Sequence, residues 1–225
     1  FMISIDIREG NRVHFEGLWE GHGIPLLHPL RLASNIVRDF QGVRYVFQED
    51  GGWLARNWRQ KGGGASGLSA SVSGWALKAA IDFGCNPIIL VGQDLAFSDK
   101  THVPGSARSR RIDPGDPTED FLWVKGLRDE KVRTSKRFVA FLNEIENMIR
   151  SQERLFINTS SRGLRIRGTA ELTLEECMER HCQTPIDIER RLPRTEPEKE
   201  VDFKGLVRDL RAELEEVQKF QTLCR

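Results

Sequence analysis

Short apolar runs alternate along this chain with longer segments in which apolar residues recur every three to four positions. Runs this short, nearly continuous and rich in Ile and Val are typical of strands covered on both faces. The sequence predicts five such strands, at Met2–Ile5, Ile24–Leu27, Val43–Phe47, Pro87–Val91 and Leu155–Ile157. Because strands and helical segments alternate, we expect a mostly parallel α/β sheet with helices on both faces.

Three segments between these strands show helical periodicity. Pro29 suits the first position of a helix that continues through residues 32–37. The apolar stripe over residues 72–83 predicts a second helix, which Gly84 ends. Thr134 is expected to cap a third helix. The apolar face of that helix contains Phe138, Phe141, Leu142, Ile145 and Ile149.

Two segments interrupt this alternation. Residues 61–67 are rich in Gly and Ser and predict a flexible connector before the second helix. Residues 98–133 are rich in Pro, Gly and charge and are expected to form a long loop. Since this loop begins directly after the polar pair Gln93-Asp94, we expect it to act as a lid or to bind an acceptor.

The C-terminal part is expected to be separate from the α/β domain. Thr173 and Glu176 have the spacing of a capping box and predict a short helix near the end of a domain over residues 1–185. Residues 186–225 are then expected to form a linker and an amphipathic helix. Its apolar residues recur in steps of four and three, at Phe203, Val207, Leu210, Leu214 and Val217. This seam either docks on its own domain or makes a contact between chains, as in a homo-oligomer.

Composition narrows the class of protein. With 39% hydrophobic residues, 30% charged residues and a formal net charge of +1, the chain has a core and no bias toward polyanions. We therefore expect no nucleic-acid partner, and no apolar run predicts a membrane span or a signal peptide. The spacing of the four cysteines fits no zinc site, so reduced thiols and a cytoplasmic location are expected. The apolar run from Phe1 predicts that the chain begins inside a domain whose N-terminal part is missing.

The ends of two predicted strands carry acidic side chains. Asp6 follows the first strand, and Gln93-Asp94 follow the fourth. Ligands of open α/β sheets bind at the carboxyl ends of the strands. Carboxylates there can accept hydrogen bonds from ligand hydroxyls or bind Mg²⁺ through hard oxygen ligands. Each acid can instead cap a neighbouring helix or stabilise a turn.

Other polar residues are expected near the same edge. Ser69, Ser71 and Ser73 precede or begin the second helix, where main-chain N–H groups and hydroxyls can bind an anion. His102 lies in the long loop, and a histidine pKa near 6.5 suits removal of a proton from a hydroxyl. Asn158 and Thr159 end the last strand and complete the predicted site.

Three stretches carry a resemblance to a known family. They are SVSGWALKAAIDFGCNPIILVGQDLAFSDKTH, VKGLRDEKVRTSKRFVAFLNEIE and FINTSSRGLRIRGTAELTLEEC. Together they resemble the motility accessory factor proteins, whose central domain is related to the archaeal hydroxymethyl-dihydropterin diphosphokinases. The resemblance extends from Phe1 to about Cys182. It implies a Rossmann-like domain similar to bacterial sialyltransferases.

The resemblance also implies a reaction. The donor would be a CMP-activated nonulosonic (sialic-like) acid, and the acceptor a Ser or Thr hydroxyl of flagellin. His102 would be the base, Asp94 and Gln93 would orient the donor, and the serines would meet its phosphate or carboxylate. Two alternatives remain open: a diphosphokinase that uses ATP with Mg²⁺ on Asp6 and Asp94, and a non-catalytic binding member of the family.

Overall fold

The computed structural model describes residues 1–49, 65–66, 69, 71–98, 121–128, 130–185 and 202–223. The chain divides into two compact units. Unit 1 comprises Phe1–Leu68 and Ile188–Arg225, and unit 2 comprises Ser69–Asp187. The boundary between residues 68 and 69 lies inside the segment that we expected to form one domain, residues 1–185.

Unit 1 contains a parallel sheet of four strands in the order β1-β2-β3-β4. The strands are β1 (Met2–Ile3), β2 (Leu26–Pro29), β3 (Arg44–Glu49) and β4 (Ala65–Ser66). The first three confirm predicted strands with shifted ends, and β4 has only two residues, too few for a hydrophobic pattern. Each pair of neighbouring strands is parallel, so the carboxyl ends of all four lie at the same edge.

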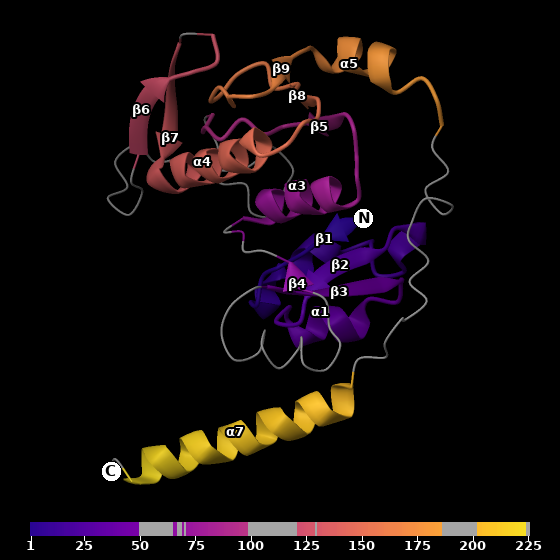
Figure 1. Ribbon diagram of the computed structural model, residues 1–225, viewed down its shortest axis with the longest axis vertical. Coiled ribbons are helices and arrows are strands. Elements are labelled where there is room, and N and C mark those ends of the chain that lie inside the picture. Colours follow the sequence, from indigo (N-terminus) through magenta and orange to yellow (C-terminus); the bar gives the residue numbers. More distant parts are fainter. Residues whose placement is uncertain are drawn as a thin grey trace. The chain divides into compact units, whose positions relative to one another are not determined.

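Short helices cover the unit 1 sheet (Figure 1). They are the 3₁₀ helices η1 (Glu9–Phe15) and η2 (Gly21–Gly23) and the α-helix α1 (Ser34–Asp39). Their shared core contains Phe15, Leu26, Leu32, Ala33, Ile36 and Phe40. The expectation that Pro29 opens a helix is wrong: Pro29 is the last residue of β2, and its carbonyl accepts a turn hydrogen bond from the Leu32 N–H at 3.1 Å. A strand end suits proline because its missing N–H interrupts no further pairing.

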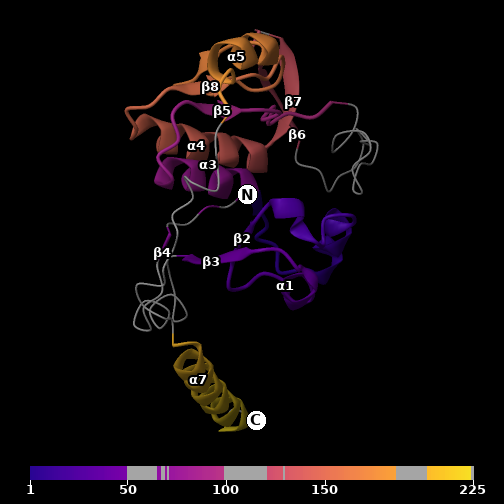
Figure 2. The same cartoon turned by 90° about the vertical axis from the view of Figure 1, so that its right-hand side faces the viewer.

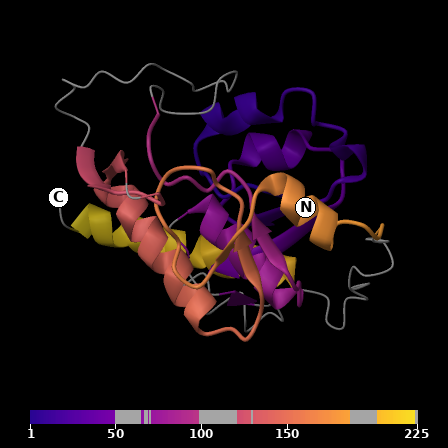
Figure 3. The same ribbon diagram turned by 90° about the horizontal axis from the view of Figure 1, so that it is seen from above.

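Unit 2 is built on a second parallel sheet in the order β5-β8-β9. Its strands are β5 (Ile88–Leu90), β8 (Phe156–Asn158) and β9 (Ala170–Glu171). The helices α3 (Val72–Asp82) and α4 (Lys136–Arg150) lie on one side of this sheet, and α5 (Leu174–His181) lies on the other (Figures 1 and 2). In the view from above, α5 is on the near side (Figure 3). The core between α3, α4 and the sheet includes Leu77, Ile81, Ile88, Leu90, Ile145, Ile149 and Phe156.

The N-terminus of each long helix in unit 2 is capped by a hydroxyl. Ser71 accepts a hydrogen bond from the Gly74 N–H at the start of α3, and Thr173 with Glu176 forms the expected capping box of α5. The expected cap of α4, Thr134, is wrong, because Ser135 is the residue that accepts from the Phe138 N–H. Thr134 is fully buried one residue earlier and donates to the Leu95 carbonyl at 2.7 Å.

The expectation of an unbroken loop over residues 98–133 is also wrong. Its C-terminal part forms an antiparallel hairpin of β6 (Phe121–Lys125) and β7 (Lys131–Ser135). Residues 99–120, including His102, lie outside the described residues. The hairpin has a period-two pattern, since Val124 and Val132 face the core of unit 2 while Trp123 faces outward.

The last helix of the chain, α7 (Phe203–Leu223), has the expected periodicity. Four residues of the predicted seam are 40–57% exposed: Val207, Leu210, Leu214 and Val217. The homo-oligomer interpretation of this seam stays a prediction. A search of the described residues for a helix long and apolar enough to cross a membrane finds none.

The fold class is thus confirmed at the level of an α/β protein with mostly parallel strands. The strands of the described residues form small sheets, of which only the β6–β7 pair is antiparallel. Cys85, Cys177 and Cys182 are free thiols, and Cys224 lies outside the described residues.

Candidate functional site

The carboxyl edge of the unit 2 sheet brings two of the predicted segments together. β5 and β8 pair in parallel with Leu90 opposite Asn158. The polar segments that follow them, Gln93-Asp94 and Thr159-Ser160, therefore leave the sheet at the same edge. The strand ends are joined tightly, because both the N–H and the hydroxyl of Thr159 donate to the Leu90 carbonyl at 3.0 Å.

The main chain of Asp94 is fixed by the loop that follows β8. The Leu164 N–H donates to the Asp94 carbonyl at 2.8 Å. Gly163 has φ +98°, and a Cβ added there would lie 2.1 Å from the same carbonyl oxygen. Only glycine allows this close approach in this conformation. The backbone around Asp94 is therefore held by a loop that lies ~70 residues later in the sequence. This is possible because β5 and β8 are neighbours in the sheet although they are far apart along the chain.

The carboxylate of Asp94 remains accessible. Its side chain is 33% exposed, and Arg162 Nε lies 3.6 Å from its Oδ2. The Arg162 side chain is itself 67% exposed. An exposed ion pair at this distance is weak, so a ligand with donors or an anion can compete for either partner. Arg162 was not among the predicted site residues, because nothing in its local sequence distinguishes it from a solvated arginine.

Asn158 is the most buried of the predicted polar residues, with 1% exposure. Its Oδ1 accepts a hydrogen bond from the Ser160 N–H at 3.1 Å. Its Nδ2, and the Oγ of Ser160, have no hydrogen-bond partner within the part of the chain that the structure describes. Buried polar atoms in proteins are nearly always hydrogen bonded, so each of these two atoms can form a further hydrogen bond at the end of β8.

The serines form a local hydrogen-bond network at the start of α3. Ser69 Oγ donates to the Ser71 carbonyl at 3.0 Å, and Ser71 Oγ lies 3.2 Å from Ser73 Oγ. Ser71 is engaged as the cap of the helix, and Ser73 is the one of the three serines that lines a cavity. A Cβ at Gly74 would lie 2.2 Å from Ser69 Oγ and 3.2 Å from Glu144 Oε1, so glycine allows α4 and the serine network to approach α3.

A cavity of about 320 Å³ lies against α3 and β5. Ser73 and Gln93 are its polar lining residues. The remaining lining is apolar and consists of Ala76, Leu77, Ala80, Ile88, Ile89, Leu90, Val91 and Ile145. The structure thus brings Ser73 and Gln93 to one cavity, whereas Asp94, Asn158 and Thr159 are not among its lining residues. An apolar pocket with a few polar groups is the usual form of a small-molecule site.

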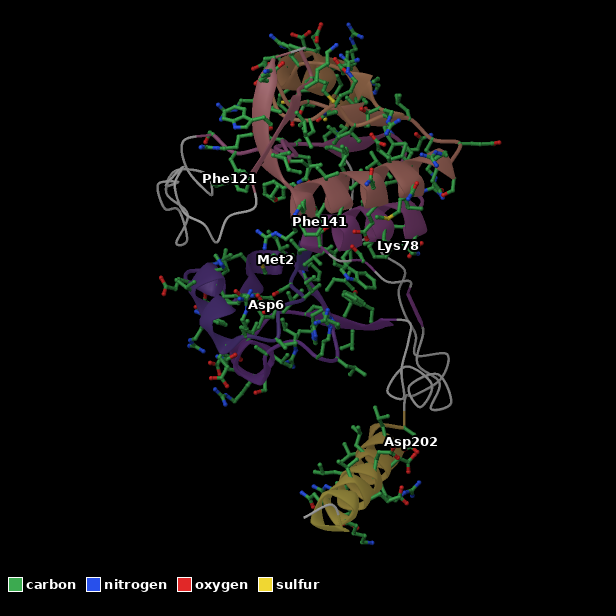
Figure 4. All side chains as sticks on the ribbon, turned by 90° about the vertical axis from the view of Figure 1, so that its left-hand side faces the viewer. Met2, Asp6, Lys78, Phe121, Phe141 and Asp202 are labelled. Atoms are coloured by element: carbon green, nitrogen blue, oxygen red, sulfur yellow. The ribbon has the colours of Figure 1, made fainter. Side chains whose placement is uncertain are left out.

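Asp6 lies in the other unit, where it follows β1 (Figure 4). Its Oδ1 accepts from the Arg8 N–H at 3.0 Å, and its Oδ2 accepts from Arg8 Nη2 at 2.8 Å. The hydrogen bond from the Arg8 side chain holds the pKa of Asp6 far below its usual range. Asp6 is therefore a carboxylate whose two oxygens already have a cationic partner.

Metal ligands do not gather among the described residues: no group of three or more His, Cys, Asp or Glu side chains there could surround an ion. The predicted base, His102, lies outside the described residues, so its position relative to Asp94 stays a prediction. The roles assigned to Ser69, Ser71, Ser73, Gln93, Asp94, Asn158 and Thr159 likewise stay predictions.

Comparison with known proteins adds two findings. A family model described as 6-hydroxymethylpterin diphosphokinase MptE-like matches residues 1–100. The structure is similar to that of the MAf glycosyltransferase from Magnetospirillum magneticum AMB-1, with 14% sequence identity and a TM-score of 0.55. No curated protein matches the chain.

The family model covers 100 of the 225 residues, and the structural match is with a protein described as a MAf glycosyltransferase. The structural match covers 76% of this chain and 26% of the glycosyltransferase chain, so this chain spans about a quarter of that protein. At 14% identity the likeness shows a shared fold.

Proposed function

We propose that this chain is part of a glycosyltransferase-like protein that transfers a nonulosonic acid from a CMP-activated donor to Ser or Thr hydroxyls of flagellin. The observation that carries the proposal is the carboxyl edge of unit 2. There the paired strands β5 and β8 lead into Asp94 and Thr159, with Asn158 as the last residue of β8, and Ser73 and Gln93 line a cavity against α3 and β5. Ligands of parallel α/β sheets bind at this edge.

The proposed donor matches the chemistry of this edge. The cavity is largely apolar and can accept the face of a nucleoside, while Gln93 and Ser73 can donate to its polar groups. A sugar carboxylate or phosphate would meet the exposed guanidinium of Arg162. The start of α3 adds main-chain N–H groups with a partial positive charge.

In the proposed reaction, the bond between the anomeric carbon and the CMP phosphate oxygen breaks, and a bond to the acceptor oxygen forms. CMP leaves with the electron pair of the broken bond. Positive charge develops on the sugar ring in the transition state, and a carboxylate such as Asp94 would stabilise it. His102 is the proposed base that takes the proton of the acceptor hydroxyl.

Thermal-shift and turnover measurements test the proposal. The purified protein should be stabilised by CMP or a CMP-sugar without added metal, because ligand binding to the native state raises its melting temperature. A protein that responds to neither nucleotide, or whose turnover is unaffected by both Asp94→Asn and His102→Ala, would exclude this assignment.

A diphosphokinase is the second candidate, supported by the family model over residues 1–100. It would transfer a diphosphate from ATP to a pterin-type alcohol, with Asp6 as a candidate ligand of the Mg²⁺. The pairing of Asp6 with Arg8 opposes this arrangement, since a metal at Asp6 would have to displace the guanidinium. Stabilisation by ATP with Mg²⁺, but not by CMP, would favour this second reaction.

A further inference from the structure

The residue that follows Asp94 has an unusual main-chain conformation. Leu95 has φ +49°, which lies in the left-handed region that residues with a side chain disfavour. The other non-glycine residue with a positive φ in the described part of the chain is His22, which is exposed. Leu95 is instead only 8% exposed and belongs to the core of unit 2. A buried leucine in this conformation is strained, and such strain persists only where the surrounding structure holds it.

Two hydrogen bonds from distant parts of the chain hold this segment. The hydroxyl of Thr134, on β7, donates to the Leu95 carbonyl at 2.7 Å, and Thr134 is fully buried, so water does not compete for the bond. The Leu164 N–H donates to the preceding carbonyl, that of Asp94, at 2.8 Å. The consecutive carbonyls of Asp94 and Leu95 are therefore fixed by two different elements, one on each side of the peptide group that joins the two residues.

The conformation at Leu95 and that at Gly92 together set the course of the main chain through Gln93 and Asp94. Gly92 has φ +68°, so a left-handed residue stands on each side of the polar pair. At Gly92 the chain uses a glycine, which adopts this conformation without strain. At position 95 it uses a leucine, whose side chain packs in the core and thereby offsets the strain. The direction in which the Asp94 side chain leaves the main chain depends on both turns.

We propose that Thr134 is a positioning residue for the Asp94 carboxylate. Its hydroxyl holds Leu95 in the left-handed conformation and so fixes the main chain from which Asp94 projects. The inference rests on the proposed function, in which the Asp94 carboxylate stabilises positive charge on the sugar ring. Such stabilisation is effective only when the charged group is held in place before the reaction begins. Thr134 acts through Leu95, because its hydroxyl is engaged by that carbonyl.

A purely structural role for the Thr134 hydroxyl would be to anchor the β6–β7 hairpin. The hairpin has two other main-chain hydrogen bonds to unit 2, however. The Phe97 N–H donates to the Arg133 carbonyl at 2.7 Å, and the Leu127 N–H donates to the Gly163 carbonyl at 2.7 Å. Both bonds remain when the Thr134 hydroxyl is removed. Loss of the hydroxyl should therefore affect the Asp94–Leu95 segment more than the attachment of the hairpin.

Amide hydrogen exchange tests the proposal on the intact chain without any reaction. The Leu164 N–H reports on the main chain of Asp94, because it donates to that carbonyl. In Thr134→Val its exchange should be about tenfold faster relative to the amides of β8, as expected for the loss of one hydrogen bond. Thr134→Ser keeps the hydroxyl and should restore the original rate. Ser135→Ala is the matched control, because it removes the neighbouring hydroxyl, which caps α4, and it should leave the relative rate unchanged.

A pair of substitutions at Leu95 tests the strain itself. Leu95→Ala and Leu95→Gly both remove the side chain from the core, so the loss of packing is nearly the same. Glycine normally destabilises relative to alanine, but at a left-handed position the order is reversed. Leu95→Gly should therefore melt at a temperature about 2–4 °C higher than Leu95→Ala. A higher melting temperature for Leu95→Ala would show that residue 95 is not held in this conformation, and the proposal would be overturned.

Turnover of a CMP-activated nonulosonic acid tests the consequence for Asp94. Thr134→Val should lower kcat about tenfold or more and change KM less than about twofold, because Ser73 and Gln93 still line the cavity. Thr134→Ser should recover kcat, and Ser135→Ala should retain it.

The outcomes separate this proposal from the proposed function. An unchanged Leu164 exchange rate in Thr134→Val, an effect on KM without one on kcat, or an equal loss of kcat in Ser135→Ala would overturn the positioning role. If the unaltered protein shows no turnover while the Leu164 exchange rate responds as expected, the proposed reaction is contradicted, and the control of the Asp94 main chain by Thr134 is supported.

Discussion

The two parallel sheets of this protein each end a strand next to an aspartate, yet the two carboxylates have different environments. In unit 1, Asp6 accepts hydrogen bonds from Arg8, two positions away, through both oxygens. In unit 2, Asp94 has its main chain fixed by Gly163 and Leu164, while its side chain has one distant partner, Arg162 at 3.6 Å. The nearby Arg8 neutralises the carboxylate of Asp6. A loop that is distant in sequence instead holds the main chain of Asp94 and leaves its carboxylate accessible.

The contrast shows what a strand followed by an acid does and does not imply. Both positions satisfy the same sequence pattern, and both carboxylates lie at the carboxyl edge of a parallel sheet. What differs is whether the next few residues supply a cation that can reach back. Arg8 does so for Asp6, whereas the residues that follow Asp94 are apolar up to Phe97. Asp94 is therefore the better candidate to meet a ligand.

Of the substitutions that test this difference between Asp6 and Asp94, replacement of Gly163 should have the largest effect on stability. In Gly163→Ala the new Cβ would overlap the Asp94 carbonyl, and φ +98° is strained for any residue with a side chain. We expect a loss of roughly 3 kcal/mol or more in the free energy of unfolding, measured by urea titration. Gly92→Ala is the matched control at the same edge, because Gly92 has φ +68° and open space around it. It should cost only about 1 kcal/mol, and equal losses in the two variants would show that contact with Asp94 is unimportant.

Charge removal at the two aspartates should separate them by function. If Asp94 stabilises the transition state, Asp94→Asn should lower turnover of the CMP-activated donor about a hundredfold with little change in melting temperature. Asp6→Asn should instead lower the melting temperature and reduce turnover much less, because its partner is Arg8. A reversed order of the two turnover losses would contradict the assignment of the site to unit 2.

Much of this arrangement was predictable where the signal is local. The five apolar strands, the stop of α3 at Gly84 and the capping box of Thr173 follow from short patterns, and the structure has each of them. The hairpin was missed because the charged residues on its outer face hide the period-two pattern of Val124 and Val132. Thr134 was assigned as a cap because Thr and Ser are interchangeable there by sequence, and only the buried bond to Leu95 distinguishes them.

The site itself was predictable only in part. Gln93, Asp94, Asn158 and Thr159 could be found because each directly follows a strand. The approach of Gly163 to Asp94 and the bond from Leu164 join residues far apart in sequence, and no local pattern specifies them. The environment that makes Asp94 accessible is a tertiary property.

Substitutions of the serines at the start of α3 should have smaller effects. They test whether each serine stabilises the helix or binds a ligand. Ser71→Ala removes the cap of α3 and should cost about 1 kcal/mol of stability. Ser73→Ala should leave stability nearly unchanged and weaken ligand binding, since Ser73 lines the cavity. Ser135→Ala, which removes the cap of α4, should match Ser71→Ala in stability and leave ligand affinity unchanged. Isothermal titration with CMP and thermal melting would measure both quantities, and a ligand effect as large in Ser135→Ala would exclude a specific role for Ser73.

The smallest expected effect concerns pH and distinguishes the unit 1 edge from the unit 2 edge. His28 is 3% exposed, and its Nδ1 is bonded to the Pro29 carbonyl at 2.9 Å. Its Nε2 has no partner among the described residues, and burial lowers the pKa of His28 below its usual 6.5. The unfolded chain therefore takes up this proton at a higher pH than the folded chain. The contribution of neutral, buried His28 to the free energy of unfolding is complete above about pH 6.5 and is lost as the pH falls below that value.

Amide hydrogen exchange between pH 8 and pH 5, corrected for the intrinsic rate, would resolve this loss by region. Protection should fall in β2, which contains His28, and much less in β8, which belongs to the other unit. His28→Gln should remove the dependence above pH 5. The lowered pKa of Asp6 acts in a different window: its stabilising contribution is present above about pH 4, the usual carboxyl range, and is lost only in stronger acid. Equal loss of protection in β2 and β8 near pH 6 would mean that the two edges respond to acid as one, and the buried His28 could not then be its cause.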